Sequence, residues 1–190
     1  TNDQLKELGS VLDLGPTGSP SAFFNLDLTG TTGLTSIPED TFHWARGLIT
    51  VSLPNTISSI GASAFRASGI TSIDLSKLPI EELDGNFDAC RDLVELILPD
   101  TITDLGDGTF TSCEKLKNVT LPDTVKYIGM NTFDGCESLE WIKIQSSTPP
   151  SIRDGLNYSF DHCNNLKTVY IVSGSRSAYD GNSTWKSVIE

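Results

Sequence analysis

Positive charge is scarce in this sequence, because 13 lysines and arginines stand against 25 aspartates and glutamates and give a net charge of −12. An acidic protein repels nucleic acids and anionic lipids unless its basic residues form a concentrated patch, and the sequence shows no such cluster. We therefore expect no nucleic-acid partner. Long apolar runs are also lacking, since none approaches the roughly 18 residues that suggest a membrane-spanning helix. We expect no direct membrane insertion of this segment.

An initiator methionine is lacking as well, because the chain begins at Thr1. We interpret the sequence as a trimmed, mature chain. A signal peptide or a lipid-anchor segment could have been removed from it, so the lack of one does not argue against export.

Residue patterns for catalysis or metal binding are also missing. The two histidines, His43 and His162, lie far apart, and their spacing suggests no nucleophile, base and orienting group. No C-x-x-C pair is present for zinc, and the acidic turns at 104–108 and 179–182 lack the ligand order of an EF-hand. We expect no catalytic residue, no metal and no cofactor.

What the sequence does contain is a tandem repeat. The stretches Leu98–Val119 and Leu121–Ile142 are identical at ten of 22 positions. Self-similarity at such a period is typical of a solenoid, in which each unit buries its apolar side against its neighbours. The repeat therefore predicts one elongated domain with a single stacked core.

Three sets of apolar residues recur at this period. The first is a triplet whose last two members alternate with an outward position, as in a half-buried strand. The triplets are Phe23/Leu26/Leu28, Leu48/Val51/Leu53, Ile70/Ile73/Leu75, Leu93/Leu96/Leu98, Leu116/Val119/Leu121, Leu139/Ile142/Ile144 and Leu166/Val169/Ile171. A second column is Ile37, Ile60, Leu83, Leu105, Ile128 and Ile152. The third column predicts an aromatic ladder along the solenoid axis and consists of Phe42, Phe65, Phe87, Phe110, Phe133 and Phe160.

Two repeats depart from the pattern. The third has the sequence Ser-Lys-Leu-Pro at 76–79 in place of the usual leucine–proline turn and is one residue shorter before Phe87, which predicts a bulge or a local twist. The sixth carries an insertion at 148–157, where Pro149 and Pro150 prevent regular strand pairing.

The repeats set the domain organisation. Residues 23–172 hold about six to seven repeats of 22 to 27 residues. We expect residues 1–22 to form an irregular N-terminal cap, with a short helix begun by Asn2 or Asp3 as an alternative for its first part. Residues 173–190 are expected to form a C-terminal cap, and the whole chain is expected to be a single structural domain.

The repeat pattern resembles that of a known family. The sequence LP-(D/N)-T-(I/V)-x-x-(I/L)-G-x-x-(A/T)-F-x-x-C-x-x-L, as at Leu121–Leu139, resembles the BspA-type leucine-rich repeats of bacterial surface proteins. The proline pair at 149–150 followed by Tyr179 and Trp185 is similar to the C-terminal cap common in gut Bacteroides members, although Ser173 stands where the family usually has proline. The resemblance implies a right-handed leucine-rich-repeat solenoid of mostly short parallel β-strands with turns and short helical segments, capped at both ends. It also implies an exported protein with a role in adhesion or in host or polymer binding.

The cysteines follow the same period, each three residues after a column phenylalanine. Ala45 and Ser68 take this place in earlier repeats, so we expect a small, buried site. One thiol per turn cannot supply tetrahedral zinc geometry. Neighbouring turns about 5 Å apart would allow a disulfide on distance, but parallel inward side chains make it awkward. We expect free, buried thiols, with a disulfide as the alternative, at Cys90, Cys113, Cys136 and Cys163.

Strand parity predicts which side chains point outward. Two outward rows cross the predicted sheet, namely Asn25, Thr50, Ser72, Glu95, Asn118, Trp141 and Thr168, and Asp27, Ser52, Asp74, Ile97, Thr120, Lys143 and Tyr170. Small polar residues dominate the N-terminal half, as on an ordinary solvated sheet. Because rigid outward aromatic residues are efficient contact anchors, we predict a ligand-binding site at Ile97, Trp141, Lys143 and Tyr170. The alternative is that long loops or the C-terminal cap fold over these residues.

We therefore expect a non-catalytic, monomeric binding or adhesion module, exported to the cell surface or the extracellular space, that recognises a protein or carbohydrate partner through the outward face of the sheet. A structural spacer within a larger surface protein is the alternative. A glycan-processing enzyme is the least favoured, because the outward carboxylates Asp27, Asp74 and Glu95 lie among serines and threonines with no sign of a raised pKa or of a second catalytic partner.

Overall fold

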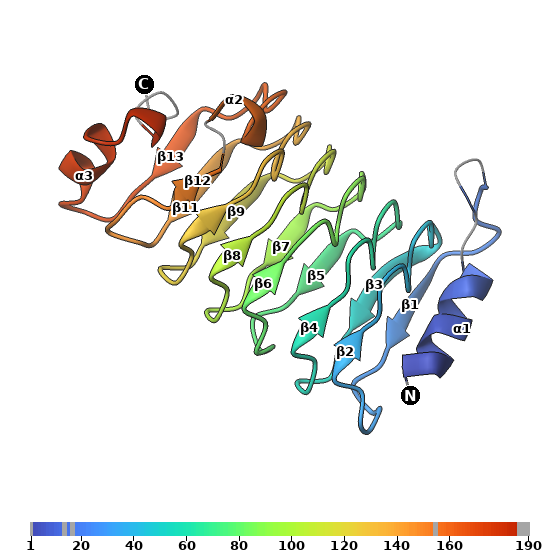
Figure 1. Cartoon of the computed structure of the whole chain (residues 1–190). Coiled ribbons are helices and arrows are strands. Elements are labelled where there is room, and N and C mark those ends of the chain that lie inside the picture. The colour runs from blue at the N-terminus through green and yellow to red at the C-terminus, as the bar shows by residue number, and fades with distance from the viewer. Residues whose placement is uncertain (1, 13–14, 16–17, 154–155, 186–190) are drawn as a thin grey trace.

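The chain forms an elongated solenoid of about six turns built from parallel strands. The computed structural model describes residues 2–12, 15, 18–153 and 156–185. Figure 1 shows the turns stacked along one axis, from helix α1 (Asn2–Leu12) at the N-terminal end to helix α3 (Arg176–Asp180) at the C-terminal end. This is the leucine-rich-repeat architecture that the repeat pattern predicts.

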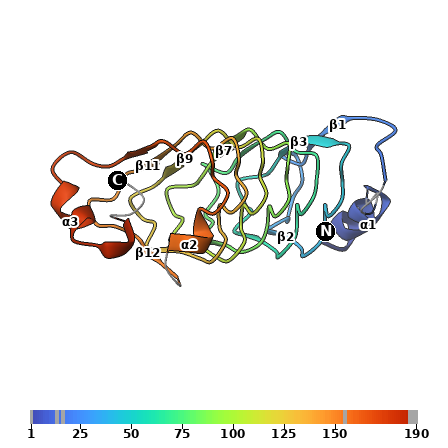
Figure 2. The same cartoon turned by 90° about the horizontal axis from the view of Figure 1, so that it is seen from above.

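Two rows of parallel strands run along opposite sides of the stack (Figure 2). The long-strand row holds β1 (Phe24–Asp27), β3 (Leu48–Ser52), β5 (Ser72–Asp74), β7 (Glu95–Ile97), β9 (Asn118–Leu121), β11 (Trp141–Ile144) and β13 (Thr168–Tyr170). The short-strand row holds β2 (Ser36–Ile37), β4 (Ser59–Ile60), β6 (Glu82–Leu83), β8 (Asp104–Leu105), β10 (Tyr127–Ile128) and β12 (Ser151–Ile152). Backbone pairing runs in the orders β1-β3-β5-β7, β9-β11-β13, β2-β4 and β6-β8-β10-β12.

The predicted apolar columns form the core between the two rows, which confirms the strand parity. In the five triplets from Leu48 to Ile144 every member is buried except Leu96, which is half-buried. The second column is buried from Ile37 to Ile128. Packing loosens at both ends of the stack, since Phe24 and Leu26 in the first turn and Leu166, Val169 and Ile171 in the last are half-buried.

The phenylalanines form the continuous ladder that their spacing predicts. Neighbouring ring centroids from Phe42 to Phe160 lie 5.1 to 5.6 Å apart, with interplanar angles of 5 to 26°. All rings up to Phe133 are fully buried. Each ring therefore fills the space between two turns and gains stacking energy beyond the burial of its area.

A polar residue directly before each of several ladder phenylalanines ties one turn to the next. The hydroxyl groups of Thr109 and Thr132 each lie within 3.1 Å of a carbonyl oxygen in their own turn and of one in the preceding turn. In the third turn Asn86 takes this place, and its longer amide donates to the carbonyl oxygens of Ile60 and Gly61, both at 2.8 Å. Buried carbonyl groups of neighbouring turns are thereby satisfied.

The third repeat, for which we predicted a bulge or a local twist, shows an interruption of strand pairing and no register shift to the following turn. Strands β5 and β6 pair in regular register with β7 and β8 of the following turn. Pairing is broken instead between β4 and β6, the place that the Asn86 amide bridges. In the shorter repeat the Asn86 side chain, longer than the threonine of later turns, reaches the carbonyl groups that strand pairing leaves open.

The first triplet is displaced by one residue. Phe24, not Phe23, lies opposite Leu48, and the register shifts between Phe24 and Asn25. Phe23 is 69% exposed, so the prediction that it begins the inward triplet is wrong. The residue left outside the pairing is Ile49 on β3, as in a bulge, so β1 spans the same distance with one residue fewer. From Asn25 onward the register is regular, and Leu26 lies opposite Val51.

Both ends of the stack are covered. The expected N-terminal cover is helical over α1, which agrees with the helix alternative; Leu5 is buried, and Gly9 packs so tightly that an added Cβ would lie 1.7 Å from the carbonyl oxygen of Thr41. At the other end the short helix α2 (Leu156–Ser159) precedes β13. The ring of Trp185 lies 6.1 Å from that of Phe160, and its Nε1 donates to the carbonyl oxygen of Pro150 at 2.6 Å. Trp185 therefore closes the C-terminal end of the aromatic ladder.

Candidate binding surface

The two outward rows of the long-strand row lie in register, as predicted. In the first row the opposed pairs are Asn25–Thr50, Thr50–Ser72, Ser72–Glu95, Asn118–Trp141 and Trp141–Thr168. In the second row they are Asp27–Ser52, Asp74–Ile97, Thr120–Lys143 and Lys143–Tyr170. Side chains at opposed positions of parallel strands share one face, so each row forms a line across the turns.

Trp141 on β11 and Tyr170 on β13 form an aromatic pair on this face. Their ring centroids lie 5.8 Å apart at an interplanar angle of 79°, an edge-to-face arrangement. The pair is diagonal, because Trp141 lies opposite Thr168 while Tyr170 lies opposite Lys143. Tyr170 is 52% exposed and Trp141 is half-buried. The alternative that the cap or a loop covers these residues is therefore wrong for Tyr170.

Lys143 and Ile97 take different places relative to this pair. Lys143 is exposed and lies directly opposite Tyr170, so the structure brings Trp141, Lys143 and Tyr170 together. Ile97 is 51% exposed but stands on β7, with Thr120 of β9 between it and Lys143. At about 4.8 Å per strand, its backbone is roughly 10 Å from that of Lys143. Ile97 is thus a separate apolar contact at the edge of the cluster.

Two outward carboxylates of the N-terminal half, Asp27 and Asp74, are held in their charged form by hydrogen bonds. Hydrogen bonds from the hydroxyl and the backbone N–H of Thr29 lower the pKa of Asp27, and the same groups of Ser76 lower the pKa of Asp74. A general acid in glycoside hydrolysis needs a raised pKa, because it must still carry its proton near neutral pH. Neither carboxylate is suited to that role.

Metal-ligand clusters and long apolar helices are both absent from the described part of the chain. Within residues 2–12, 15, 18–153 and 156–185, no three histidine, cysteine, aspartate or glutamate side chains gather closely enough to hold a metal ion. No helix in these ranges has the length and apolar character needed to cross a bilayer.

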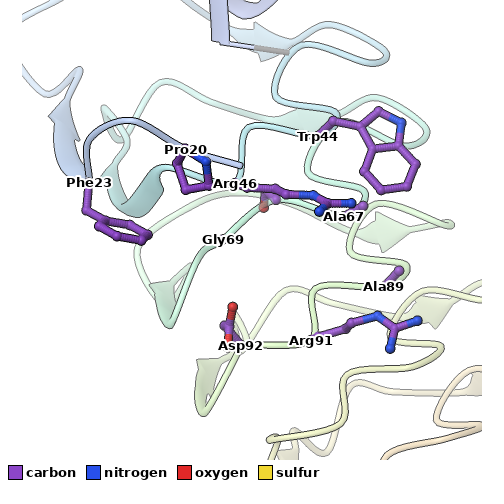
Figure 3. Close-up of a pocket in the computed structure, with 10 residues that line it drawn as sticks. Pro20, Phe23, Trp44, Arg46, Ala67, Gly69, Ala89, Arg91 and Asp92 are labelled. Atoms are coloured by element: carbon purple, nitrogen blue, oxygen red, sulfur yellow. The ribbon is translucent and has the colours of Figure 1, made fainter. Parts of the chain in front are cut away.

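A groove that the sequence reasoning missed lies where the chain turns after the first ladder phenylalanines (Figure 3). Its volume is about 590 Å³, and we call it the edge groove; the residues that matter below are Phe23, Trp44, Arg46, Gly69, Arg91 and Asp92. Two signals in the sequence point to it. A tryptophan stands two residues after Phe42, where the next three turns have alanine or serine, and the second repeat lacks one residue before Ile70.

The comparisons with known proteins agree with this architecture. The family model described as the BspA type leucine rich repeat region matches residues 20–86 and 83–182, with six copies. The chain belongs to the BspA-type leucine-rich-repeat family. This repeat fold is typical of protein-interaction or structural modules, and leucine-rich-repeat proteins are generally non-catalytic. No curated protein matches the chain significantly.

Solved structures resemble this BspA-type chain in fold. A leucine-rich-repeat protein of T. pallidum is 23% identical over 77% of the chain and 58% of its own, with a TM-score of 0.50. A leucine-rich-repeat protein of Bacteroides ovatus is 23% identical over 74% and 47%, with a TM-score of 0.41. A leucine-rich cell surface protein of Faecalibacterium prausnitzii is 18% identical over 84% and 62%, with a TM-score of 0.40. The chain thus spans about half to three fifths of the length of these structures.

The cysteine column of this BspA-type protein consists of free thiols. Cys90, Cys113 and Cys136 are buried and Cys163 is half-buried. Burial raises the pKa of the Cys90 and Cys163 thiols to about 12 and that of the other two well above the ordinary value. A thiol acts as a nucleophile or a metal ligand in its thiolate form, so these four side chains are packing residues.

Proposed function

We propose that this chain is a non-catalytic binding module that recognises a protein or carbohydrate partner through the C-terminal half of its long-strand row. The outward aromatic pair of half-buried Trp141 and exposed Tyr170 carries this proposal. Aromatic rings bring large contact areas and restrict few rotatable bonds on binding, so they are frequent anchors of interfaces. Lys143 beside them supplies a positive charge on a protein whose net charge is −12.

The position of the pair on the solenoid supports the same function. Trp141 lies on β11, which is paired on both sides by β9 and β13, so its backbone is fixed before any ligand arrives. A pre-organised surface loses little entropy on binding. The N-terminal half of the same face carries short polar side chains such as Thr50 and Ser72, which suit a solvated surface better than a contact surface.

We place the module outside the cell, at the surface or free. Membership of the BspA-type family supports this location, because the repeat resemblance implies export. Its four free cysteines are compatible with a location outside the cell, because three are buried in the core and Cys163 is half-buried. A spacer domain within a larger surface protein is the competing function, and it differs in requiring no ligand.

A binding screen separates these functions. The purified chain is applied to an array of glycans and host-matrix proteins, together with the variant Trp141→Ala. The proposal expects at least one ligand that the natural chain retains and that Trp141→Ala loses. The spacer function expects no specific ligand at all.

The control variant is Tyr127→Ala. Tyr127 is 46% exposed on β10, in the short-strand row on the opposite side of the stack (Figure 2). It is therefore an exposed aromatic residue of the same solenoid, outside the proposed surface. Ligands of the proposed surface should bind Tyr127→Ala as they bind the natural chain, whereas equal losses in both variants would show unspecific adhesion to aromatic residues.

A further inference from the structure

The edge groove follows from one missing residue in the second repeat. A small residue follows each ladder phenylalanine by three positions, and a short spacer joins it to the next apolar triplet. The spacer has two residues in the first turn (46–47) and in the third (91–92). In the second turn it is Gly69 alone, between Ser68 and Ile70. The second turn is thus recessed between its neighbours. Gly69 allows this close packing, because a Cβ there would lie 2.0 Å from the carbonyl oxygen of Arg46.

Two aromatic rings stand at opposite ends of this recess (Figure 3). Phe23 is 69% exposed, because Phe24 takes the place opposite Leu48 and Phe23 lies before the paired strand. Trp44 is half-buried and has a φ of 56°, in the left-handed region that bulky side chains seldom occupy. The equivalent places in the next four turns also have positive φ but hold the small residues Ala67, Ala89, Ser112 and Gly135, and the last turn has His162. A tryptophan is therefore not required there by the fold, and its strained position points to a role at the surface.

Two guanidinium groups complete the groove. Arg46 places its guanidinium carbon 4.9 Å from the centre of the Trp44 ring, which orients the flat cation within the groove. Arg91, from the third turn, pairs through Nη1 with Glu114 and has further N–H donors on the same guanidinium. The carboxylate in the lining, Asp92, accepts a hydrogen bond from Lys115 at 2.6 Å, so its charge is compensated. The lining holds two arginines against one aspartate, an excess of one positive charge, and the charges of their neighbours Glu114 and Lys115 cancel each other.

The backbone of the groove argues against an extended peptide as the ligand. The N–H groups of Trp44, Ala67, Gly69 and Ala89 already donate to carbonyl oxygens of neighbouring turns at 2.8 to 3.2 Å. Peptides that add a strand to a sheet need an open edge of such groups. What this groove presents is flat aromatic faces and guanidinium donors. The apolar face of a sugar ring stacks on an aromatic ring, and a sugar carboxylate pairs with guanidinium in a bidentate, charge-assisted arrangement.

We propose that the edge groove binds a carboxylate-bearing sugar of an acidic polysaccharide. Trp44 and Phe23 contact the sugar rings, and Arg46 and Arg91 hold the carboxylates. The volume of about 590 Å³ lies within the range typical of small-ligand sites and suits a short oligosaccharide. This site is distinct from the Trp141 and Tyr170 surface, because it draws on the first three turns and not on the last two.

Calorimetric titration with trigalacturonate, a tri-uronic acid, at low salt tests this site. We expect the natural chain to bind it at least about tenfold more tightly than maltotriose, a neutral trisaccharide, because only the former offers carboxylates to arginine. Trp44→Ala should weaken binding by about tenfold or more and Arg91→Gln by about fivefold or more, with the effect of Arg91→Gln shrinking as salt is added. Arg91 is largely exposed, so Arg91→Gln keeps the test valid even if Trp44→Ala folds poorly.

The matched control is Arg66→Gln, which removes the same charge one turn away. Arg66 is exposed, pairs with Asp88 at 2.7 Å and does not line the groove, so Arg66→Gln should change the affinity for trigalacturonate by less than about twofold. Trp141→Ala should leave this affinity unchanged, which separates the groove from the proposed sheet surface. No binding of trigalacturonate, an equal loss in Arg66→Gln, or equally tight binding of pentaglutamate would each overturn the assignment.

Discussion

The thiol of Cys113 donates a hydrogen bond to the carbonyl oxygen of Phe87, 3.4 Å away in the preceding turn. The same relationship holds in every turn that has a cysteine, with distances of 2.9 to 3.3 Å, for Cys90 with Phe65, Cys136 with Phe110 and Cys163 with Phe133. Each thiol therefore satisfies a carbonyl group of the turn before it. The cysteine column is a structural element that runs beside the aromatic ladder.

Thiol labelling tests the role of this column. Because the thiols are enclosed and their pKa values are raised by burial, a maleimide reagent at neutral pH should react slowly with the native protein. The half-buried Cys163 should react first. After unfolding without reductant the count should reach four. A lower count after unfolding would reveal a disulfide, and fast native labelling of Cys113 would contradict the burial described above.

Phe110 is expected to contribute strongly to stability, because its buried ring is stacked between those of Phe87 and Phe133. Phe110→Ala should lower the free energy of unfolding by about 3 to 5 kcal/mol. Thr120→Ala, in an outward row, should cost less than about 0.5 kcal/mol. Urea unfolding of both variants measures the difference. Similar losses in the two would contradict the assignment of the aromatic column.

Asn86 should also be sensitive, because its side chain replaces interrupted strand pairing. Asn86→Ala leaves the carbonyl groups of Ile60 and Gly61 without their amide donor, and the backbone N–H of Asp84 loses its acceptor. We expect a loss of about 2 to 4 kcal/mol in the free energy of unfolding. Asn118→Ala, the same change at an exposed position, should remain within about 0.5 kcal/mol. A cost for Asn86→Ala no larger than that of the control would show that water satisfies the bridge equally well.

His162 should titrate above its ordinary pKa, because its ring Nδ1 lies 2.8 Å from the carboxylate of Asp134 and Asp161 adds a further negative charge. A raised pKa in the folded state means that the ion pair stabilises the protein below the pKa of the unfolded histidine. This stabilisation is lost as the pH rises through the folded value. NMR titration of the imidazole protons should show a lower pKa in Asp134→Asn and a smaller decrease in Asp161→Asn. The reverse order would rule out the hydrogen bond as the main cause.

Most of the fold could be predicted from the sequence because one period governs every column. The identity of neighbouring repeats fixes the register, and strand parity then places Trp141 and Tyr170 outward without any structural information. A solenoid repeats the same local packing in each turn, so a wrong prediction for one turn does not affect the prediction for the next. The place of Phe23 shows this, since the one-residue shift at Phe24 leaves the register regular from Asn25 onward.

The edge groove could not be predicted in the same way. Its two arginines are 45 positions apart in the sequence and come together only through stacking of the turns, so a search for neighbouring basic residues does not find them. The missing residue before Ile70 is visible in the sequence, but the resulting recess depends on how the first and third turns extend past the second. Likewise the third repeat predicts an irregularity, but its solution through the Asn86 side chain depends on three-dimensional distances.

The most direct test of the proposed binding surface uses the strongest ligand found in the binding screen. Its affinity is measured by calorimetric titration for the natural chain, for Trp141→Ala and for Tyr127→Ala. The account predicts that Trp141→Ala weakens binding by about tenfold or more, as expected for a central aromatic anchor, while Tyr127→Ala changes it by less than about twofold. The natural chain and the two variants should melt within a few degrees of one another, so that any loss of affinity reflects a lost contact and not poor folding. Equal affinity of Trp141→Ala and the natural chain would contradict the claim that Trp141 and Tyr170 form the contact surface.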